Sequence, residues 1–198
     1  SNKVVSGYEI EKMLPKAREE HAIILDFLPN GYHFDKRPMH MKTPIAQAIG
    51  KSHFILLELV PKKEVFLQPN QEVYTGEGKR DEIHHIAGKL EYEKLTQTGK
   101  INLEETIKKL VVDNPKKFIE FFNKAGPINM RMHQLELLPG IGKRHMIAIL
   151  EARDEKEFET FKDIKDRVSL LPDPDGAIIK RVLLELEGNE KHYLFVRG

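Results

Sequence analysis

The sequence predicts an α+β protein, in which a small N-terminal β-barrel is followed by an all-α C-terminal domain. Two observations support this fold class. Residues 20–98 contain short apolar runs separated by turn residues, which is typical of a small barrel or sandwich. From Asn102 onward, the apolar residues recur with the period of helices. The chain therefore divides into a barrel over 1–100, connecting helices over 101–127 and a helical domain over 128–198.

The expected strands lie almost entirely before residue 100. Residues 22–28 form an apolar run that Pro29-Asn30-Gly31 closes, which is typical of a strand followed by a turn. Other strand-like runs are at 52–60, 64–67, 72–75 and 83–95, with a last short strand at 192–196. Strands this short, with turns this frequent, favour a small barrel similar to an OB-fold.

Helices are expected in the rest of the chain. Asn102 is a suitable N-cap for the first, because an acid follows three positions later. Pro115 suits the first position of a second helix, where its missing N–H costs nothing, and Gly126-Pro127 ends that helix. Further helices are expected at 128–138, at 143–153, from 160, and at 176–186.

The connection between the helices expected at 128–138 and 143–153 carries the strongest functional signal. It reads Leu138-Pro139-Gly140-Ile141-Gly142. Pro139 ends the first helix, and the two glycines leave the main chain bare, while Ile141 turns inward. Unpaired N–H groups beside a helix N-terminus form an anion site. We therefore predict that amides of this turn are free to bind phosphate.

Two cations follow this turn directly. Lys143 and Arg144 lie in the first turn of the next helix, where a cation opposes the helix dipole unless an anion is present. Their position favours a phosphate ligand over the alternative of a tight Gly-X-Gly link between two helices. Because the whole chain has a net charge of only +1, binding should be local, salt-sensitive and directed at the nucleic-acid backbone.

This stretch resembles the helix-hairpin-helix motif that many DNA and RNA enzymes share. Residues 138–142, Ile149 and Arg153 match the motif, whereas Met146 stands where a small alanine is usual. The resemblance implies contacts to the nucleic-acid backbone that do not read its sequence. The amides on which this role falls are those of Gly140, Ile141, Gly142 and Lys143.

A second hairpin follows, with the same layout of helix, leucine-proline turn and helix. Its turn begins at Leu171-Pro172, but Asp173 and Asp175 would repel a phosphate and Pro174 has no N–H to donate. We interpret it as a structural support for the first hairpin. A metal site at the two aspartates is the less favoured alternative, because acids are common at the start of a helix.

Two stretches of the expected barrel carry further candidate contacts. Residues 32–42 interleave aromatic and basic side chains in a loop, including Lys36 and Arg37, and rim loops of barrels often hold single-stranded nucleic acid. The alternative is an ordinary surface loop. Lys79 and Arg80 follow an expected hairpin turn and are candidates for additional phosphate contacts.

The sequence contains no convincing catalytic, metal or cofactor site. Cysteine is absent, which excludes disulfides and cysteine-based zinc sites. His84 and His85 are adjacent in an expected strand and so point to opposite faces. Asp163 and Asp166 lie near the position of the catalytic aspartate that DNA glycosylases carry beyond their hairpin, but the rest of that enzyme's pattern is not recognisable. We therefore expect no enzyme activity and no cofactor.

Taken end to end, the chain resembles the mainly archaeal domain-of-unknown-function 655 family, which is described as predicted RNA-binding. That resemblance combines the N-terminal half, residues 138–142 and the degenerate second hairpin. It implies RNA in preference to DNA. With no membrane-spanning run and no signal-peptide pattern, we expect a cytoplasmic nucleic-acid-binding protein. A protein–protein adaptor is the first alternative, and a DNA glycosylase or nuclease the second.

Overall fold

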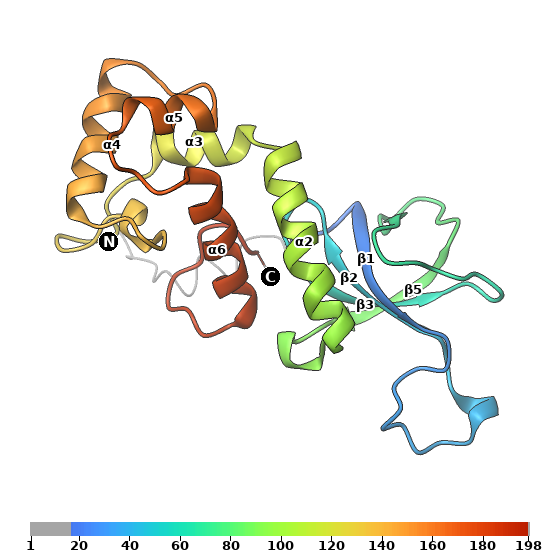
Figure 1. The fold of residues 1–198 in the computed structure, drawn as a ribbon. Coiled ribbons are helices and arrows are strands. Elements are labelled where there is room, and N and C mark those ends of the chain that lie inside the picture. The colour runs from blue at the N-terminus through green and yellow to red at the C-terminus, as the bar shows by residue number, and fades with distance from the viewer. Residues whose placement is uncertain (1–16, 198) are drawn as a thin grey trace, which may run out of the picture.

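The structure is a computed structural model that describes residues 17–197, so residues 1–16 of the expected barrel lie outside it (Figure 1). A five-stranded sheet precedes a set of helices, which confirms the α+β class. The strands are β1 (His21–Leu28), β2 (Ile45–Gly50), β3 (Leu56–Pro61), β4 (Glu72–Tyr74) and β5 (Ile83–Lys89). The α-helices are α2 (Gln97–Asp113), α3 (Lys116–Lys124), α4 (Lys143–Glu155), α5 (Phe161–Arg167) and α6 (Pro174–Glu187). Three short 3-10 helices are η1 (Met39–Met41), η2 (Tyr92–Lys94) and η3 (Gln134–Leu137).

The sheet is a curled half-barrel with a Greek-key order. Its strands lie in the order β4-β1-β2-β3-β5, and each neighbouring pair is antiparallel. Three consecutive strands with the fourth beside the first are the defining arrangement of a Greek key. An irregularity in β1 between Ile24 and Asp26 increases the local twist. The expected barrel is therefore open between its edge strands β4 and β5.

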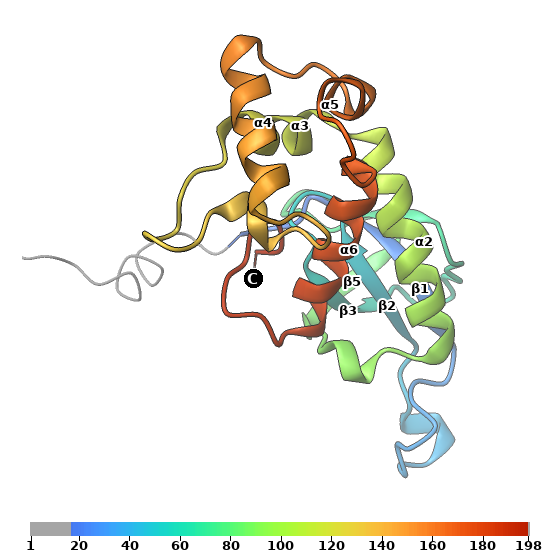
Figure 2. The same ribbon diagram turned by 60° about the vertical axis from the view of Figure 1, so that its left-hand side comes forward.

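The two faces of the sheet bury different apolar clusters, because successive side chains of a strand point to opposite sides. Ile24 faces the inside of the curl, whereas its neighbour Leu25 faces the helices. Ile49 and Leu56 lie on the same outer face as Leu25, in a cluster that continues through α2 to α6. Figure 2 shows α2 lying across the sheet. The outer face is thus filled by this chain's own helices.

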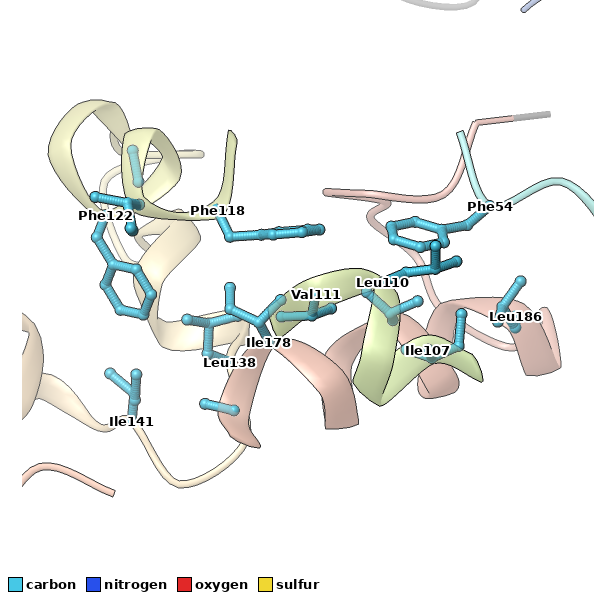
Figure 3. Packing of buried hydrophobic residues seen from close by; sticks show 14 of the residues in the cluster. Phe54, Ile107, Leu110, Val111, Phe118, Phe122, Leu138, Ile141, Ile178 and Leu186 are labelled. Atoms are coloured by element: carbon cyan, nitrogen blue, oxygen red, sulfur yellow. The ribbon is translucent and has the colours of Figure 1, made fainter. Parts of the chain in front are cut away.

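One hydrophobic cluster runs from the sheet to the hairpin. Phe118 of α3 is fully buried and its ring stacks on that of Phe54, with the ring centroids 6.1 Å apart. Figure 3 shows Phe122, also of α3, gathered with Leu138 and Ile141 of the turn before α4. The turn that carries the candidate site is therefore anchored in the same core as the sheet.

The structure corrects several expected helix and strand boundaries. The first helix begins at Gln97 and not at Asn102, because the Thr96 side chain accepts the N–H of Gly99 and caps it. Asn102 instead donates from its amide to the Leu25 carbonyl oxygen, 2.8 Å away. No strand forms over 64–67 among the described residues.

Two larger corrections concern the helical half. The helix expected over 128–138 is wrong: the chain makes a loop closed by a bridge between Pro127 and His133, and only the 3-10 helix η3 follows. The strand expected over 192–196 is also absent from the described chain, because its amides bind a buried carboxylate of α6 and not a neighbouring strand. No helix within residues 17–197 combines the length and apolar character needed to cross a membrane.

Candidate functional site

The turn before α4 is a type II β-turn. The N–H of Ile141 donates to the carbonyl oxygen of Leu138 at 3.1 Å, and Gly140 has a φ of +84°. A proline at the second position and a left-handed glycine at the third define this turn type. The prediction that the Ile141 amide is free is therefore wrong, because the turn itself uses it. A Cβ on Gly140 would also lie only 3.2 Å from Cγ of Pro172.

Gly142 differs from Gly140, because nothing in the described fold requires a glycine there. Its φ of −98° and ψ of −169° are extended values that any residue adopts, and a Cβ at this position would meet no atom within 4 Å. Gly142 is nevertheless the N-cap of α4, where serine, threonine, aspartate or asparagine would stabilise the helix better. What glycine provides here is bare main chain facing solvent.

The first turn of α4 leaves several amides without an acceptor. The first N–H bonded within the helix is that of Met146, which donates to the Gly142 carbonyl oxygen at 2.9 Å. Among residues 17–197, no acceptor faces the N–H groups of Gly142, Lys143, Arg144 and His145. The first three of these residues are exposed. Free donors at the positive end of a helix dipole are suited to an anion.

The side chain of Ile141 fixes this geometry without a ligand. Ile141 is only 4% exposed and packs in the core with Leu138 and Ile149, as predicted (Figure 3). Because the turn is held on its inner side by apolar packing, its outer side keeps one orientation. The amides are therefore held in one orientation.

The cations around the turn are only partly neutralised. Lys143 Nζ lies 3.5 Å from an oxygen of Glu136 and donates to the carbonyl oxygen of Arg131 at 3.3 Å. The guanidinium groups of Arg131 and Arg144 have no carboxylate partner within the described chain, and both residues are exposed. Three exposed cations thus lie in the first turn of α4 or in the loop that contacts it, and one of them is paired.

Two other basic residues near the turn have structural roles. Arg153 donates from Nη1 to the carbonyl oxygens of Phe122 and Ala125, at 3.2 and 2.8 Å, and so closes the end of α3. His133 is buried, and its Nδ1 accepts the N–H of Leu135 at the start of η3. Neither is available to a ligand.

The His133 cap predicts a pH-dependent stability. Burial, together with the charge of Arg153, lowers the pKa of His133 below its usual 6.5. Below pH 6.5 the unfolded chain therefore binds a proton that the folded chain refuses, and stability falls; above this pH the contribution is complete. We expect the melting temperature of His133→Asn to fall less between pH 7.5 and about pH 5 than that of the wild type, because an amide oxygen can accept the same N–H. Equal falls in both proteins would contradict this role.

The residues before α6 contact the turn and the start of α4. Pro172 lies against Gly140, and the ring Nε2 of His145 is 3.0 Å from the carbonyl oxygen of Leu170. Asp173 is the N-cap of α6 and pairs with Lys165. Within residues 17–197, no cluster of three or more histidine, aspartate or glutamate side chains could hold a metal ion.

The candidate residues of the barrel lie far from the turn. Residues 29–44 project beyond the sheet, at the end of the molecule opposite α4 (Figures 1 and 2). In this loop Arg37 forms a close ion pair with Asp35, with 2.7 Å between Nη2 and Oδ2, and this pair lowers the pKa of Asp35 to about 2. The rings of Tyr32 and Phe34 stack with centroids 4.9 Å apart, and Phe34 is 66% exposed.

The structure leaves two of the four predicted barrel cations unpaired within the described chain. Arg80 donates to the carbonyl oxygens of Gly76 and Thr75, at 2.7 and 3.2 Å, so its guanidinium group holds its own loop. Lys36 and Lys79 are exposed, with no carboxylate partner in residues 17–197. They are therefore the barrel cations best placed to contact a ligand.

Sequence reasoning missed two parts of this site. The amides of Arg144 and His145 complete the set of free donors, and the absence of a capping side chain at Gly142 was the signal for them. The exposed Leu170 beside His145 had no signal in the sequence, because its position depends on contacts between the two hairpins.

The fold is that of an α+β protein in which a five-stranded, curled half-barrel sheet is followed by five α-helices that share a core with it. The chain belongs to the family of proteins of unknown function DUF655, whose model matches residues 18–197. It is 40% identical over 189 residues to the uncharacterised protein MJ0038 of Methanocaldococcus jannaschii, which covers 94% of this chain and 84% of that protein. The crystal structure of Af1531 from Archaeoglobus fulgidus, a member of the same family, is similar with a TM-score of 0.82 and 41% identity, covering 89% of this chain and 99% of that one.

Proposed function

We propose that this protein is a non-catalytic nucleic-acid-binding protein whose turn before α4 acts as a helix-hairpin-helix motif. The observation that carries the proposal is the bare glycine at the N-cap of α4, beside unpaired amides that an anion would satisfy. A backbone phosphate is such an anion, and amides of Gly142, Lys143 and Arg144 would hold it. Contacts of this kind carry no base information, so binding is largely independent of sequence.

RNA is the ligand that we favour over DNA. The half-open, five-stranded Greek-key sheet is consistent with an OB-like fold, whose loops commonly bind oligonucleotides. Because helices cover the outer face of the sheet, we assign such contacts to its loops. The stacked Tyr32 and Phe34, with Lys36 beside them, form a candidate second contact in the loop between β1 and β2.

A protein–protein adaptor is the alternative function. The near-neutral net charge of +1 and the exposed apolar side chains beside α4 are compatible with a protein partner. The glycosylase alternative finds less support. Oδ2 of Asp163 accepts the N–H of Glu159 at 3.0 Å and lies 3.3 Å from Nη1 of Arg167, which fits a residue that stabilises the start of α5.

A salt titration tests the proposed function. We expect the affinity for fluorescently labelled RNA to fall steeply as salt rises, because binding releases counterions from each neutralised phosphate. Arg144→Gln should weaken binding on every sequence and reduce the slope of log affinity against log salt by about 0.7 for a single strand. Lys63 is an exposed lysine in the turn after β3, so Lys63→Gln is the matched control and should change neither the affinity nor the slope. Salt-insensitive binding would favour the adaptor.

A further inference from the structure

Leu170, in the connection between α5 and α6, is both exposed and strained. Its side chain is 92% exposed, and its φ of +59° is a left-handed value that a bulky residue rarely adopts. A hydrogen bond between the carbonyl oxygen of Leu170 and Nε2 of His145 holds Leu170 beside the first turn of α4. Neither burial nor backbone preference explains a leucine at this position.

Met130 is a second exposed apolar residue, in a loop that contacts the start of α4. It lies fully exposed at the tip of a loop that is closed by N–H groups of Ile128 and Asn129, both bonded to the Met132 carbonyl oxygen. The carbonyl oxygen of the next residue, Arg131, accepts a hydrogen bond from Lys143 Nζ. Figure 2 shows this loop, in yellow, projecting beside the N-terminal end of α4. Its exposed tip is thus held in a defined place.

The segments that carry the two exposed apolar residues contact the first turn of α4 at two residues, Lys143 and His145. Lys143 contacts the Met130 loop and His145 contacts Leu170. Residues two apart on a helix point about 200° apart, because each residue turns the helix by about 100°. A phosphate on the amides of the first turn would therefore lie between the two segments that carry the exposed apolar residues.

From this arrangement we infer that the hairpin binds single-stranded nucleic acid, with Leu170 and Met130 covering the bases next to the held phosphate. The inference rests on the proposed function. In a duplex, the base faces are stacked and hidden, so an apolar side chain beside the backbone gains nothing. In a single strand the faces are open to such contacts. The neighbouring cations Arg131, Lys143 and Arg144 favour a polyanion over an uncharged apolar partner.

Three labelled RNA probes of about 12 nucleotides, a typical site size for single-strand binders, test the inference by fluorescence anisotropy. They are a single strand of mixed sequence, the blunt duplex of that sequence, and an abasic strand with the same phosphates. We expect the wild type to bind the single strand about fivefold or more tightly than either other probe. Leu170→Gly and Met130→Ser should each remove about threefold or more of that preference and leave the abasic affinity unchanged.

The glycine variant also separates binding from stability. Glycine adopts a φ of +59° without strain, so the melting temperature of Leu170→Gly should equal or exceed that of the wild type. Ile101→Ser is the matched control, because Ile101 is an exposed apolar residue on α2, remote from the hairpin, and should change no affinity. A wild type that binds all three probes equally, with Leu170→Gly unchanged, would overturn the inference alone. Failure to bind any probe would instead refute the proposed function.

Discussion

Replacing Gly142 with valine is expected to abolish most nucleic-acid binding while the protein stays folded. The backbone of Gly142 is extended and its added side chain meets no atom within 4 Å, so the fold accepts valine, at a cost to the helix cap of about 1 kcal/mol at most. The methyl groups would stand where a phosphate oxygen must approach the amides to about 2.9 Å. Losing one or two charge-assisted hydrogen bonds, each about 1.5–3 kcal/mol, predicts an affinity at least about 30-fold weaker.

Gly140→Ala provides the matched control, because it should lower the stability of the fold, whereas Gly142→Val should lower the affinity. Here the φ of +84° and the nearby Pro172 ring require glycine for the fold, so alanine should cost about 1–2 kcal/mol of stability. Thermal unfolding and RNA affinity, measured on both variants, separate the two glycines. Wild-type affinity in Gly142→Val, measured on folded protein, would show that the amides of α4 do not hold the ligand.

The sequence predicted the elements whose signals are local. The pair of a proline and a left-handed glycine defines the turn at residues 139–140, and Lys143 starts α4 as expected. The apolar side chain of Ile141 was sufficient to predict that this residue is buried, because only one side of a surface turn faces the core. In these places neighbouring residues determine the conformation, so inspection of the chain is enough.

The misassigned elements have both local and long-range causes. Residues 128–138 have apolar spacing compatible with a helix, but pairing of Pro127 with His133 closes them into a loop instead. The Ile141 amide was expected to be free, although a type II turn consumes that N–H by its own geometry. The sequence also could not show that helices cover the outer face of the sheet, because that packing joins residues far apart in the chain.

The C-terminal segment depends on a buried ion pair that no motif indicated. The Glu185 carboxylate accepts the N–H groups of Leu194, Phe195 and Val196 at 2.9–3.0 Å and the Nε of Arg181 at 2.8 Å. Arg181 is itself buried and donates to the carbonyl oxygen of Leu137, just before the hairpin turn, at 3.4 Å. The Glu185 carboxylate therefore binds the amides that a last strand would have paired, and its partner Arg181 links α6 to the residues that precede the turn.

We expect Glu185→Ala to cause the largest loss of stability, about 3–5 kcal/mol, because it removes the closest carboxylate partner of the buried Arg181, leaving only Glu190 at 3.4 Å, and leaves three main-chain amides without an acceptor. For a chain of this size, each kcal/mol lowers the melting temperature by about 2–4 °C. Glu187→Ala, at an exposed position two residues along α6, should change stability by less than about 0.5 kcal/mol. The double variant Arg181→Met/Glu185→Leu should recover part of the loss, since it removes both buried charges together. Equal melting temperatures for Glu185→Ala and Glu187→Ala would contradict this prediction. They would show that the carboxylate contributes little and that apolar contacts hold the C-terminal segment, chiefly those of Phe195 with Phe118 and Phe121.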